Sequence, residues 1–380
     1  MTPPRVLLAS TEPPAVGGSS TASLDLFRRM LADGWDVHYV HVLHDVDAAF
    51  HQMDFEGGLG DAGGIPNLHY CCVPELSSKC QSSLASLVAE IAPAVSVGFG
   101  FLATGLLKAA APDGRVIFVT GTCRQAQDFV TTGRARDAMA LEGGLSTGAI
   151  TPRIINRGEE VALDRCDLLV THSEQTKAMF EWFFAESIGK MYPSTVSFAE
   201  WIAAGAEPWQ HLARAFAERD IDVLFIASDW ARVEKNYAMV SRLGRRLEGL
   251  RVHVVGDVPH PLRWAVHHGF LPDRQTLFEL MSRARSIVCP SLIDAAPGIL
   301  FEGAVMGCNL VASRNCGNWK VCHPDLLVEP FDEAHLAECI HLATTRRYDD
   351  RLDHFRTQGA YRQLTAIIQA ISQPFQAQAI

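Results

Sequence analysis

The sequence predicts an α/β protein with two doubly wound, mostly parallel sheets. Short apolar runs rich in β-branched residues recur along all 380 residues and alternate with segments of helical periodicity, which is the pattern of repeated βαβ units. The rhythm is interrupted once, between about Ile188 and Ile221, and then begins again. A chain of this length is expected to form about two domains, each with its own core.

The first half opens as a βαβ unit. Residues 5–10 predict a strand, and the loop after it contains Gly17 and Gly18. A helix follows whose apolar residues recur three and four positions apart, and Gly34 ends it. Further strands are predicted at residues 36–42, 68–73, 94–98, 116–120 and 168–171.

The second half repeats this alternation. Strands are predicted at residues 222–228, 251–256, 286–290, 309–312 and 326–328, and the chain ends in a helix near residues 351–371. We therefore expect a first domain over residues 1–200, a second over residues 201–350, and a C-terminal helical segment over residues 351–380.

The composition excludes several classes of protein. Hydrophobic residues make up 48% and charged residues 20% of the chain, which is typical of globular proteins. A formal net charge of −10 disfavours broad nucleic-acid binding. The ten cysteines include no C-x-x-C pair, so we expect reduced core thiols in a cytoplasmic protein. No stretch approaches a signal peptide or a membrane span, and peripheral contact with a membrane stays open.

The most informative segment is DAAPGILFE, which runs from Asp294 to Glu302. It follows a predicted strand, and Pro297 and Gly298 mark a turn into a helix that contains Ile299. Free backbone N–H groups at a helix start favour anions such as phosphate. Carboxylates accept hydrogen bonds from hydroxyls of a sugar or ribose. Amides for phosphate beside acids for hydroxyls suit a nucleotide sugar.

This segment and its continuation, GAVMGCNLVAS at residues 303–313, resemble the retaining glycosyltransferases of family four. The pattern of that family is an acid, seven residues and Glu, then a small-residue helix and a Gly-Xaa-Xaa-Val-Xaa-Ala/Ser strand. The resemblance implies the GT-B fold, in which two Rossmann-like domains face a cleft. It also implies acceptor binding mainly by the first domain, donor binding mainly by the second, and a last helix that returns toward the first.

The resemblance implies roles for several residues. Asp294 would hold donor-sugar hydroxyls and Glu302 the ribose, while Lys235 and Arg232 would meet the diphosphate. The remaining donor-site residues would be Pro297, Gly298 and Ile299 at the helix start, Gly17 and Gly18 near the donor phosphate and acceptor, and Phe270 and Leu271 at the nucleotide base.

The sequence departs from the family pattern at three places. Asp294 stands where Glu is usual, and Trp230 stands where the family has its Arg, which leaves Arg232 as a substitute. The family's first-domain His is missing from the expected strand end, where Thr120, Thr122 and Arg124 stand instead. Arg124 is accordingly a candidate contact to sugar or acceptor.

No metal site is expected. His38, His41 and His44 lie three apart on a predicted strand, where neighbours at that spacing point to opposite faces. The D-x-D pairs at Asp45/Asp47 and Asp220/Asp222 lie away from the donor segment.

The resulting hypothesis is a metal-independent, retaining hexosyltransferase without a cofactor. It would use a UDP- or GDP-linked sugar and a saccharide, glycolipid or small-molecule acceptor, in polysaccharide biosynthesis in the cytoplasm or at the inner face of the membrane. Two alternatives stay open: an epimerase or hydrolase of nucleotide sugars on the same fold, and a non-catalytic scaffold that binds a nucleotide sugar.

Overall fold

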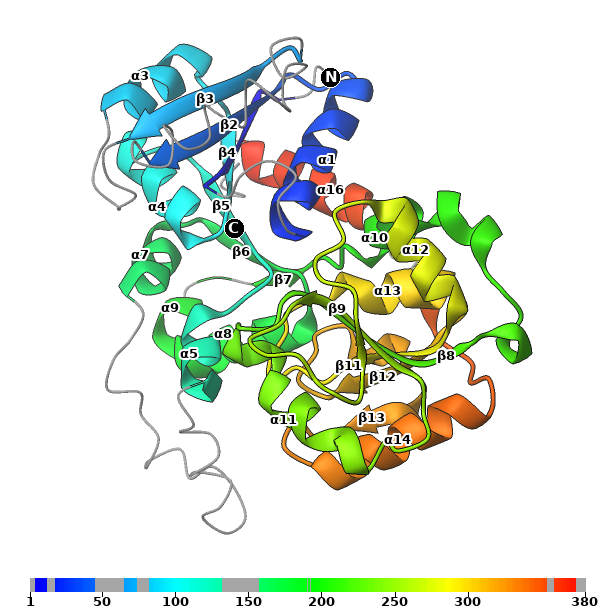
Figure 1. Cartoon of the computed structure of the whole chain (residues 1–380). Helices are drawn as coiled ribbons and strands as arrows, with labels where there is room; N and C mark the ends of the chain where they lie inside the picture. The colour runs from blue at the N-terminus through cyan, green and yellow to red at the C-terminus, as the bar shows by residue number, and fades with distance from the viewer. Residues whose placement is uncertain are drawn as a thin grey trace, which may run out of the picture.

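The structure is a computed structural model that describes residues 4–11, 18–44, 65–73, 82–131, 157–189, 191, 193–353 and 359–373. These residues form two parallel β-sheets of seven and six strands, each with helices on both faces (Figure 1). The predicted α/β class with two doubly wound sheets is confirmed.

The first sheet has the strand order β3-β2-β1-β4-β5-β6-β7, and every neighbouring pair is parallel. Its strands are β1 (Val6–Ser10), β2 (Val37–His44), β3 (Leu68–Val73), β4 (Val95–Phe99), β5 (Val116–Thr120), β6 (Leu168–Thr171) and β7 (Ser194–Thr195). The six predicted strands are present with ends within two residues of those expected. β7 consists of Ser194 and Thr195 and has no apolar residue, so no hydrophobic pattern revealed it.

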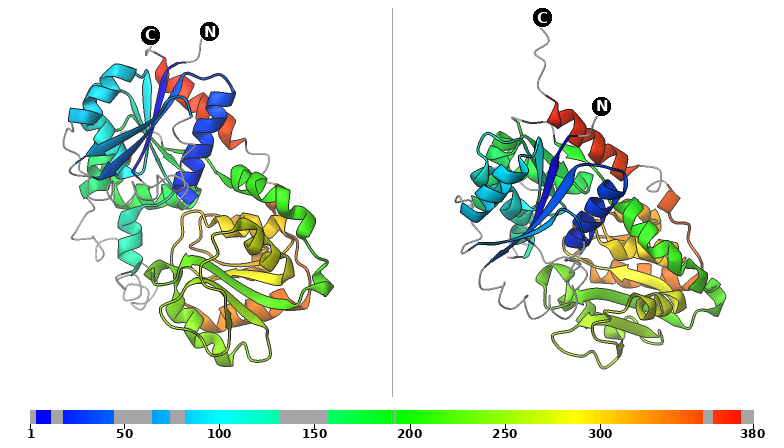
Figure 2. Two further views of the ribbon diagram at one scale, coloured as in Figure 1. Left: turned by 45° about the horizontal axis from the view of Figure 1, so that its top comes forward. Right: turned by 90° about the horizontal axis from the view of Figure 1, so that it is seen from above.

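Helices α1 (Gly18–Ala32) and α16 (Ala360–Ser372) cover one face of this sheet, and α3 (Ser82–Ile91) and α4 (Phe101–Ala110) cover the other. Buried residues of α1 include Leu24, Phe27 and Met30, as its periodicity predicted. Helix α16 lies beside α1 (Figures 1 and 2), and the Arg29 guanidinium stands 4.1 Å from the centre of the Tyr361 ring. The last helix therefore belongs to the core of the first sheet.

Four further helices belong to the first half of the chain. They are α5 (Arg124–Thr131), α7 (Arg157–Arg165), α8 (Glu174–Phe183) and α9 (Ala185–Ile188). The Ser173 hydroxyl accepts a hydrogen bond of 3.1 Å from the Thr176 amide and so caps α8.

The second sheet has the order β10-β9-β8-β11-β12-β13, again with parallel pairs throughout. Its strands are β8 (Ile221–Asp229), β9 (Val252–Asp257), β10 (Val266–His267), β11 (Ala284–Cys289), β12 (Asn309–Ser313) and β13 (Leu327–Val328). All five predicted strands are present with ends within two residues of those expected. β10 was missed because its two residues, Val266 and His267, include only one apolar side chain and give no hydrophobic pattern.

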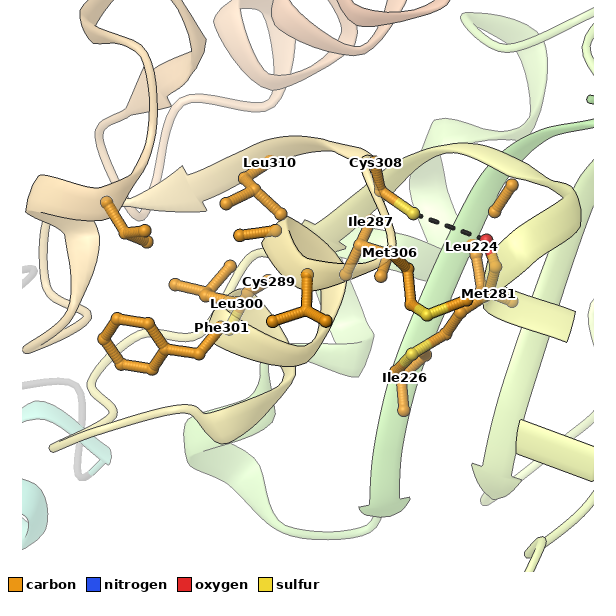
Figure 3. Close-up of a cluster of buried hydrophobic side chains, with 14 of the residues drawn as sticks. Leu224, Ile226, Met281, Ile287, Cys289, Leu300, Phe301, Met306, Cys308 and Leu310 are labelled. Atoms are coloured by element: carbon orange, nitrogen blue, oxygen red, sulfur yellow. Dashed lines mark hydrogen bonds between the residues drawn. The ribbon is translucent and has the colours of Figure 1, made fainter. Parts of the chain in front are cut away.

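Helices α10 (Ala199–Ala206), α12 (Arg274–Arg283) and α13 (Gly298–Val305) pack on one face of this sheet, and α11 (Tyr237–Arg242) and α14 (Glu333–Thr345) on the other. Short 3-10 helices join them: η2 (Glu207–Leu212), η3 (Phe216–Glu218), η4 (Val233–Lys235), η5 (Leu243–Arg245), η6 (Trp319–Val321) and η7 (Pro324–Leu326). Figure 3 shows Leu300 and Phe301 of α13 in the same buried cluster as Ile287 and Leu310 of the strands. This packing fixes where α13 begins.

The strand order places a switch point in each sheet. From β8 the chain moves outward through β9 to β10, whereas from β11 it moves in the opposite direction through β12 to β13. The loops that leave the carboxyl ends of β8 and β11 therefore diverge and leave a crevice. Ligands of open α/β sheets bind in such crevices.

Candidate functional site

Lys235 and Asp294 meet at this switch point. Lys235 follows β8 and Asp294 follows β11, and the Lys235 Nζ lies 2.5 Å from the Asp294 Oδ2. The two side chains are 19% and 14% exposed, so the ion pair is shielded from bulk water yet still reachable. The structure thus brings together the two leading residues that the sequence proposed.

The backbone around Lys235 is held by Asn236. Asn236 adopts the left-handed conformation with φ 64° and ψ 37°, which Asn tolerates better than most residues. Its buried side-chain amide donates to the Pro290 carbonyl oxygen at 2.9 Å and to the Pro330 carbonyl oxygen at 3.0 Å. The Lys-Asn step therefore ties the loop after β8 to the end of β11.

Asp294 is held by backbone hydrogen bonds on both sides. Its amide donates to the Asn315 carbonyl oxygen at 3.1 Å, and the Gly317 amide donates to the Asp294 carbonyl oxygen at 2.7 Å. A Cβ on Gly317 would lie 1.7 Å from the Ala295 carbonyl oxygen, so only glycine fits there. The loop after β12 thereby fixes the backbone at Asp294, and the carboxylate contacts Lys235.

The electrostatics keep Lys235 positively charged. Burial alone lowers the pKa of Lys235, but the adjacent Asp294 carboxylate raises it, and the net direction is upward. Arg232 adds a second cation, whose Nη2 lies 2.5 Å and whose Nε lies 2.7 Å from the Glu234 Oε1. Arg232 is half exposed and neutralised by Glu234 in this arrangement.

A small cavity of about 30 Å³ beside these groups is lined by residues from both halves of the chain. Thr122 and Gln127 line it from the first half of the chain, and the other lining residues are Arg232, Glu234, Lys235, Ile293, Asp294 and Ala295. Ile293 packs in a buried cluster with Phe118 and Cys123 of the first half. The site therefore lies at the junction of the two sheets' layers.

Arg124 points elsewhere. Its Nε lies 3.5 Å from the Asp128 Oδ1 and its Nη1 lies 3.4 Å from the Gln127 Oε1, along its own helix α5. Its side chain does not line the cavity. Gln127, one turn later on α5, is the residue that does, and sequence reasoning missed it because no strand or turn pattern marks it.

The start of α5 is fixed by a buried carboxylate that sequence reasoning also missed. Glu159 on α7 accepts hydrogen bonds from the Arg124 amide at 2.5 Å and from the Gln125 amide at 2.8 Å. Burial raises the pKa of Glu159 to about 7, against these two hydrogen bonds. Glu159 thereby positions the helix that carries Gln127.

Glu302 lies one turn into α13, as predicted. Its Oε1 is 3.2 Å from the Arg274 Nη2, and the two side chains are 13% and 51% exposed. Burial raises the pKa of Glu302, and the Arg274 charge opposes that rise. Pro297 precedes the helix, which begins at Gly298, and Ile202 of α10 lies 3.5 Å from where a Cβ on Gly298 would stand.

The remaining candidates are dispersed. Ile299 and Leu271 pack against the core of the second sheet. Phe270, the residue before Leu271, is 53% exposed. Gly18 begins α1, and Gly17 lies outside the described residues. Trp230 is buried and donates from its Nε1 to the Val255 carbonyl oxygen at 2.9 Å, so it is a core residue.

Metal ligands do not cluster in the part of the chain that the structure describes, where no group of three or more His, Cys, Asp or Glu could hold an ion. Asp220 and Asp222 sit at the amino end of β8 and pair with Arg283 and Arg251. Asp45 and Asp47 lie outside the described residues.

Within the described ranges, no helix has the length and apolarity needed to cross a bilayer.

No protein-family model matches the sequence, and no curated protein matches it. Solved structures do. Sucrose-phosphate synthase from Thermosynechococcus elongatus is 14% identical, with 97% of this chain and 96% of that chain covered at a TM-score of 0.63. An α,α-trehalose-phosphate synthase (UDP-forming) from Burkholderia xenovorans, in complex with glucose-6-phosphate, is 12% identical, with 97% and 100% covered at 0.63.

HepE from Anabaena, in complex with UDP and glucose, is 12% identical, with 97% of this chain and 96% of that chain covered at a TM-score of 0.58. At sequence identities this low, the similarity shows a shared fold and does not show a shared activity. The likeness extends over nearly the whole chain and both sheets. The protein has the GT-B fold, with two Rossmann-like domains.

Proposed function

We propose that this protein is a retaining glycosyltransferase that moves a sugar from a nucleotide-sugar donor to a hydroxyl-bearing acceptor. The observation that carries the proposal is the contact between Lys235 and Asp294, 2.5 Å apart at the switch point between β8 and β11. A buried ammonium suits a departing diphosphate, and a carboxylate beside it suits the hydroxyls of the attached sugar.

The donor would lie along the second domain. Asp294 would bind the sugar, Lys235 and Arg232 the diphosphate, and Glu302 the ribose. The turn at Pro297, Gly298 and Ile299 would supply amides, and the segment of Phe270 and Leu271 would border the base. UDP- and GDP-linked sugars both fit these roles.

The acceptor would enter from the first domain. Thr122 and Gln127 line that side of the cavity and offer a hydroxyl and an amide to an incoming sugar, and the loop of Gly17 and Gly18 would lie nearby. The ligands named for two similar structures, UDP with glucose and glucose-6-phosphate, support a donor and acceptor of this kind. We place the reaction in polysaccharide or glycolipid assembly, in the cytoplasm or at the inner face of a membrane.

The reaction would proceed on one face of the donor sugar. The bond from the anomeric carbon to the acceptor oxygen forms as the bond to the diphosphate oxygen breaks. The acceptor proton passes to a donor phosphate oxygen, and nucleoside diphosphate leaves. Lys235 would stabilise the charge that grows on the diphosphate, and no divalent cation would be needed.

A panel of UDP- and GDP-sugars, each with and without saccharide and lipid acceptors, tests this function. We expect product only when donor and acceptor are both present, and unchanged turnover in EDTA. Product from donor alone would identify an epimerase or hydrolase, and donor binding without any product would identify a scaffold. Loss of turnover in EDTA that Mg²⁺ or Mn²⁺ restores would contradict the metal-independent mechanism.

Glu302→Gln should weaken binding of the nucleoside diphosphate. The ribose would lose a charged acceptor, and hydrogen bonds to charged groups contribute about 1.5–3 kcal/mol, roughly ten- to a hundred-fold in affinity. Calorimetry with UDP and GDP measures the change. Glu279→Gln on the exposed face of α12 is the matched control, since the Glu279 carboxylate accepts a hydrogen bond from the Gln275 side chain on the same helix. Equal affinity of both mutants would remove Glu302 from the ribose site.

A further inference from the structure

Arg274 occupies a fixed position at the start of α12. The preceding Asp273 carboxylate accepts hydrogen bonds from the Gln275 amide at 3.3 Å and the Thr276 amide at 2.8 Å, and so caps the helix. The Arg274 guanidinium lies 5.2 Å from the centre of the Phe278 ring, and its Nη2 donates to the Gly205 carbonyl oxygen at 3.4 Å. The cap, the ring and the carbonyl together aim this guanidinium at α13.

The same Nη2 lies 3.2 Å from the Glu302 Oε1. Glu302 is only 13% exposed, and burial makes its carboxylate costly to ionise. The ribose role needs the ionised form, because only a carboxylate offers both oxygens as acceptors. Arg274 supplies the opposite charge that favours ionisation.

Other charged groups around α13 are engaged elsewhere. Helix α13 packs against α10, β11, β12 and η6, and the titratable groups described on these elements are Arg285 and Cys289 on β11 and Lys320 on η6. Arg285 pairs with Asp222, Cys289 contacts Cys316, and Lys320 lies over the Trp319 ring. Across the junction, the Arg274 charge opposes the rise that burial causes in the pKa of Asp25 on α1. Asp25 is not among the groups that shift the pKa of Glu302. Among the described residues, Arg274 is the cation that acts on Glu302.

We propose that Arg274 is a positioning residue for nucleotide binding: it holds Oε1 of Glu302, keeps the carboxylate ionised, and leaves Oε2 to accept the ribose hydroxyls. This inference rests on the proposed function, since it needs a nucleotide at Glu302. Arg274 itself contacts the protein and not the donor. Its effect is therefore expected in the pH dependence of donor binding.

The test compares Arg274→Met with Arg283→Met, an arginine at the other end of α12 whose partner is Asp220. Donor affinity is measured by calorimetry at pH 8 and pH 6, with UDP-glucose and with GDP-mannose. The diphosphate of a nucleotide sugar is a diester that keeps its charge over this range. Whichever of UDP-glucose and GDP-mannose the wild type binds more tightly is then used for all variants.

The sign follows from the pKa of Glu302. Burial raises it and Arg274 opposes the rise, so removal of Arg274 moves protonation of Glu302 to higher pH. Affinity that depends on the carboxylate is lost as pH falls through that pKa, by up to about ten-fold per pH unit. At pH 8 we expect Arg274→Met to bind about two- to five-fold more weakly than wild type, in keeping with a half-exposed ion pair.

At pH 6 we expect Arg274→Met to bind more weakly than at pH 8, by up to about ten-fold per pH unit below the pKa of Glu302, and to move toward the affinity of Glu302→Gln. Wild type and Arg283→Met should change by less than about three-fold between the two pH values. Arg274→Lys, which keeps the charge, should restore most of the pH independence.

Distinct outcomes separate the positioning role of Arg274 from the assignment of the donor site. If Glu302→Gln weakens donor binding but Arg274→Met follows wild type at both pH values, the positioning role is wrong and the donor site stands. Tighter binding by Arg274→Met would mean that Arg274 occupies the ribose position, which also overturns the inference. No binding of either probe by wild type, or full affinity in Glu302→Gln, would overturn the donor assignment itself. Melting temperatures confirm that each variant is folded, and Arg274→Lys decides the matter if the methionine variant is not.

Discussion

Asp294→Asn should reduce sugar transfer by at least about 100-fold and leave the affinity for free nucleoside diphosphate almost unchanged. Asp294 would contact the donor sugar, which free nucleoside diphosphate lacks. The carboxylate also faces Lys235 at 2.5 Å, so its loss changes the charge beside the reacting bond. Steady-state transfer and calorimetry with UDP and GDP measure the two effects separately.

The second variant, Asp294→Glu, restores the residue usual in the family that this sequence resembles. The longer side chain would shift the carboxylate, and a misplacement of about 1 Å in a positioned site can cost roughly 10²-fold. We therefore expect a changed sugar preference or a slower rate.

Asp257→Asn is the matched control, because Asp257 ends strand β9 of the same sheet with an exposed side chain. Removing the Asp294 charge leaves a shielded Lys235 ammonium without its partner, at a cost of up to about 3 kcal/mol in the free energy of unfolding. Melting curves must therefore accompany the rates. Wild-type transfer by both Asp294 variants would make this carboxylate structural and remove the main support for the enzyme.

Lys235→Ala should lower kcat more than it raises KM for the donor. The ammonium would stabilise charge that develops on the diphosphate mainly in the transition state, and such interactions act on kcat. We expect a loss of about 100-fold in kcat, measured at saturating acceptor. Lys320→Ala on η6 is the control, since Lys320 lies away from the cavity over the Trp319 ring.

Double substitution tests whether the pair acts as a unit. Lys235 and Asp294 are in contact, so the loss in Lys235→Ala/Asp294→Asn should be well below the product of the single losses. A Lys235→Ala variant with wild-type kcat would reduce the contact to a structural ion pair. Strictly multiplicative losses would mean that the two residues act on separate steps.

Much of the fold could be predicted from local pattern alone. The alternation of apolar runs and helical spacing placed the strands from β1 to β6 and five of the six in the second sheet within two residues, because side-chain period and turn chemistry are local properties. The layout of the segment from Asp294 to Glu302 was also local, since Pro297 and Gly298 mark the helix start wherever the helix lies. β7 and β10 left no pattern to detect, because neither contains a run of apolar residues. β13 is equally short but was predicted, because both of its residues are apolar.

The contacts that make the site are of another kind. Lys235 and Asp294 are 59 residues apart, Arg274 and Glu302 are 28 apart, and Glu159 reaches the start of α5 from 35 residues away. A resemblance could nominate Lys235 and Asp294, but it gave no sign of Gln127, Glu159 or Arg274.

By itself the sequence determined the strands, the helices and the turn that carries the two acids. The tertiary structure alone decided which loops meet. β8 lies between β9, which follows it in the chain, and β11, which is distant in sequence. The loops after β8 and β11 therefore share one crevice. It also decided that Trp230 is core and that Arg124 lies along α5. Strand order depends on how crossover helices bury their apolar faces against a sheet. That is a property of the whole domain, which no short stretch of sequence contains.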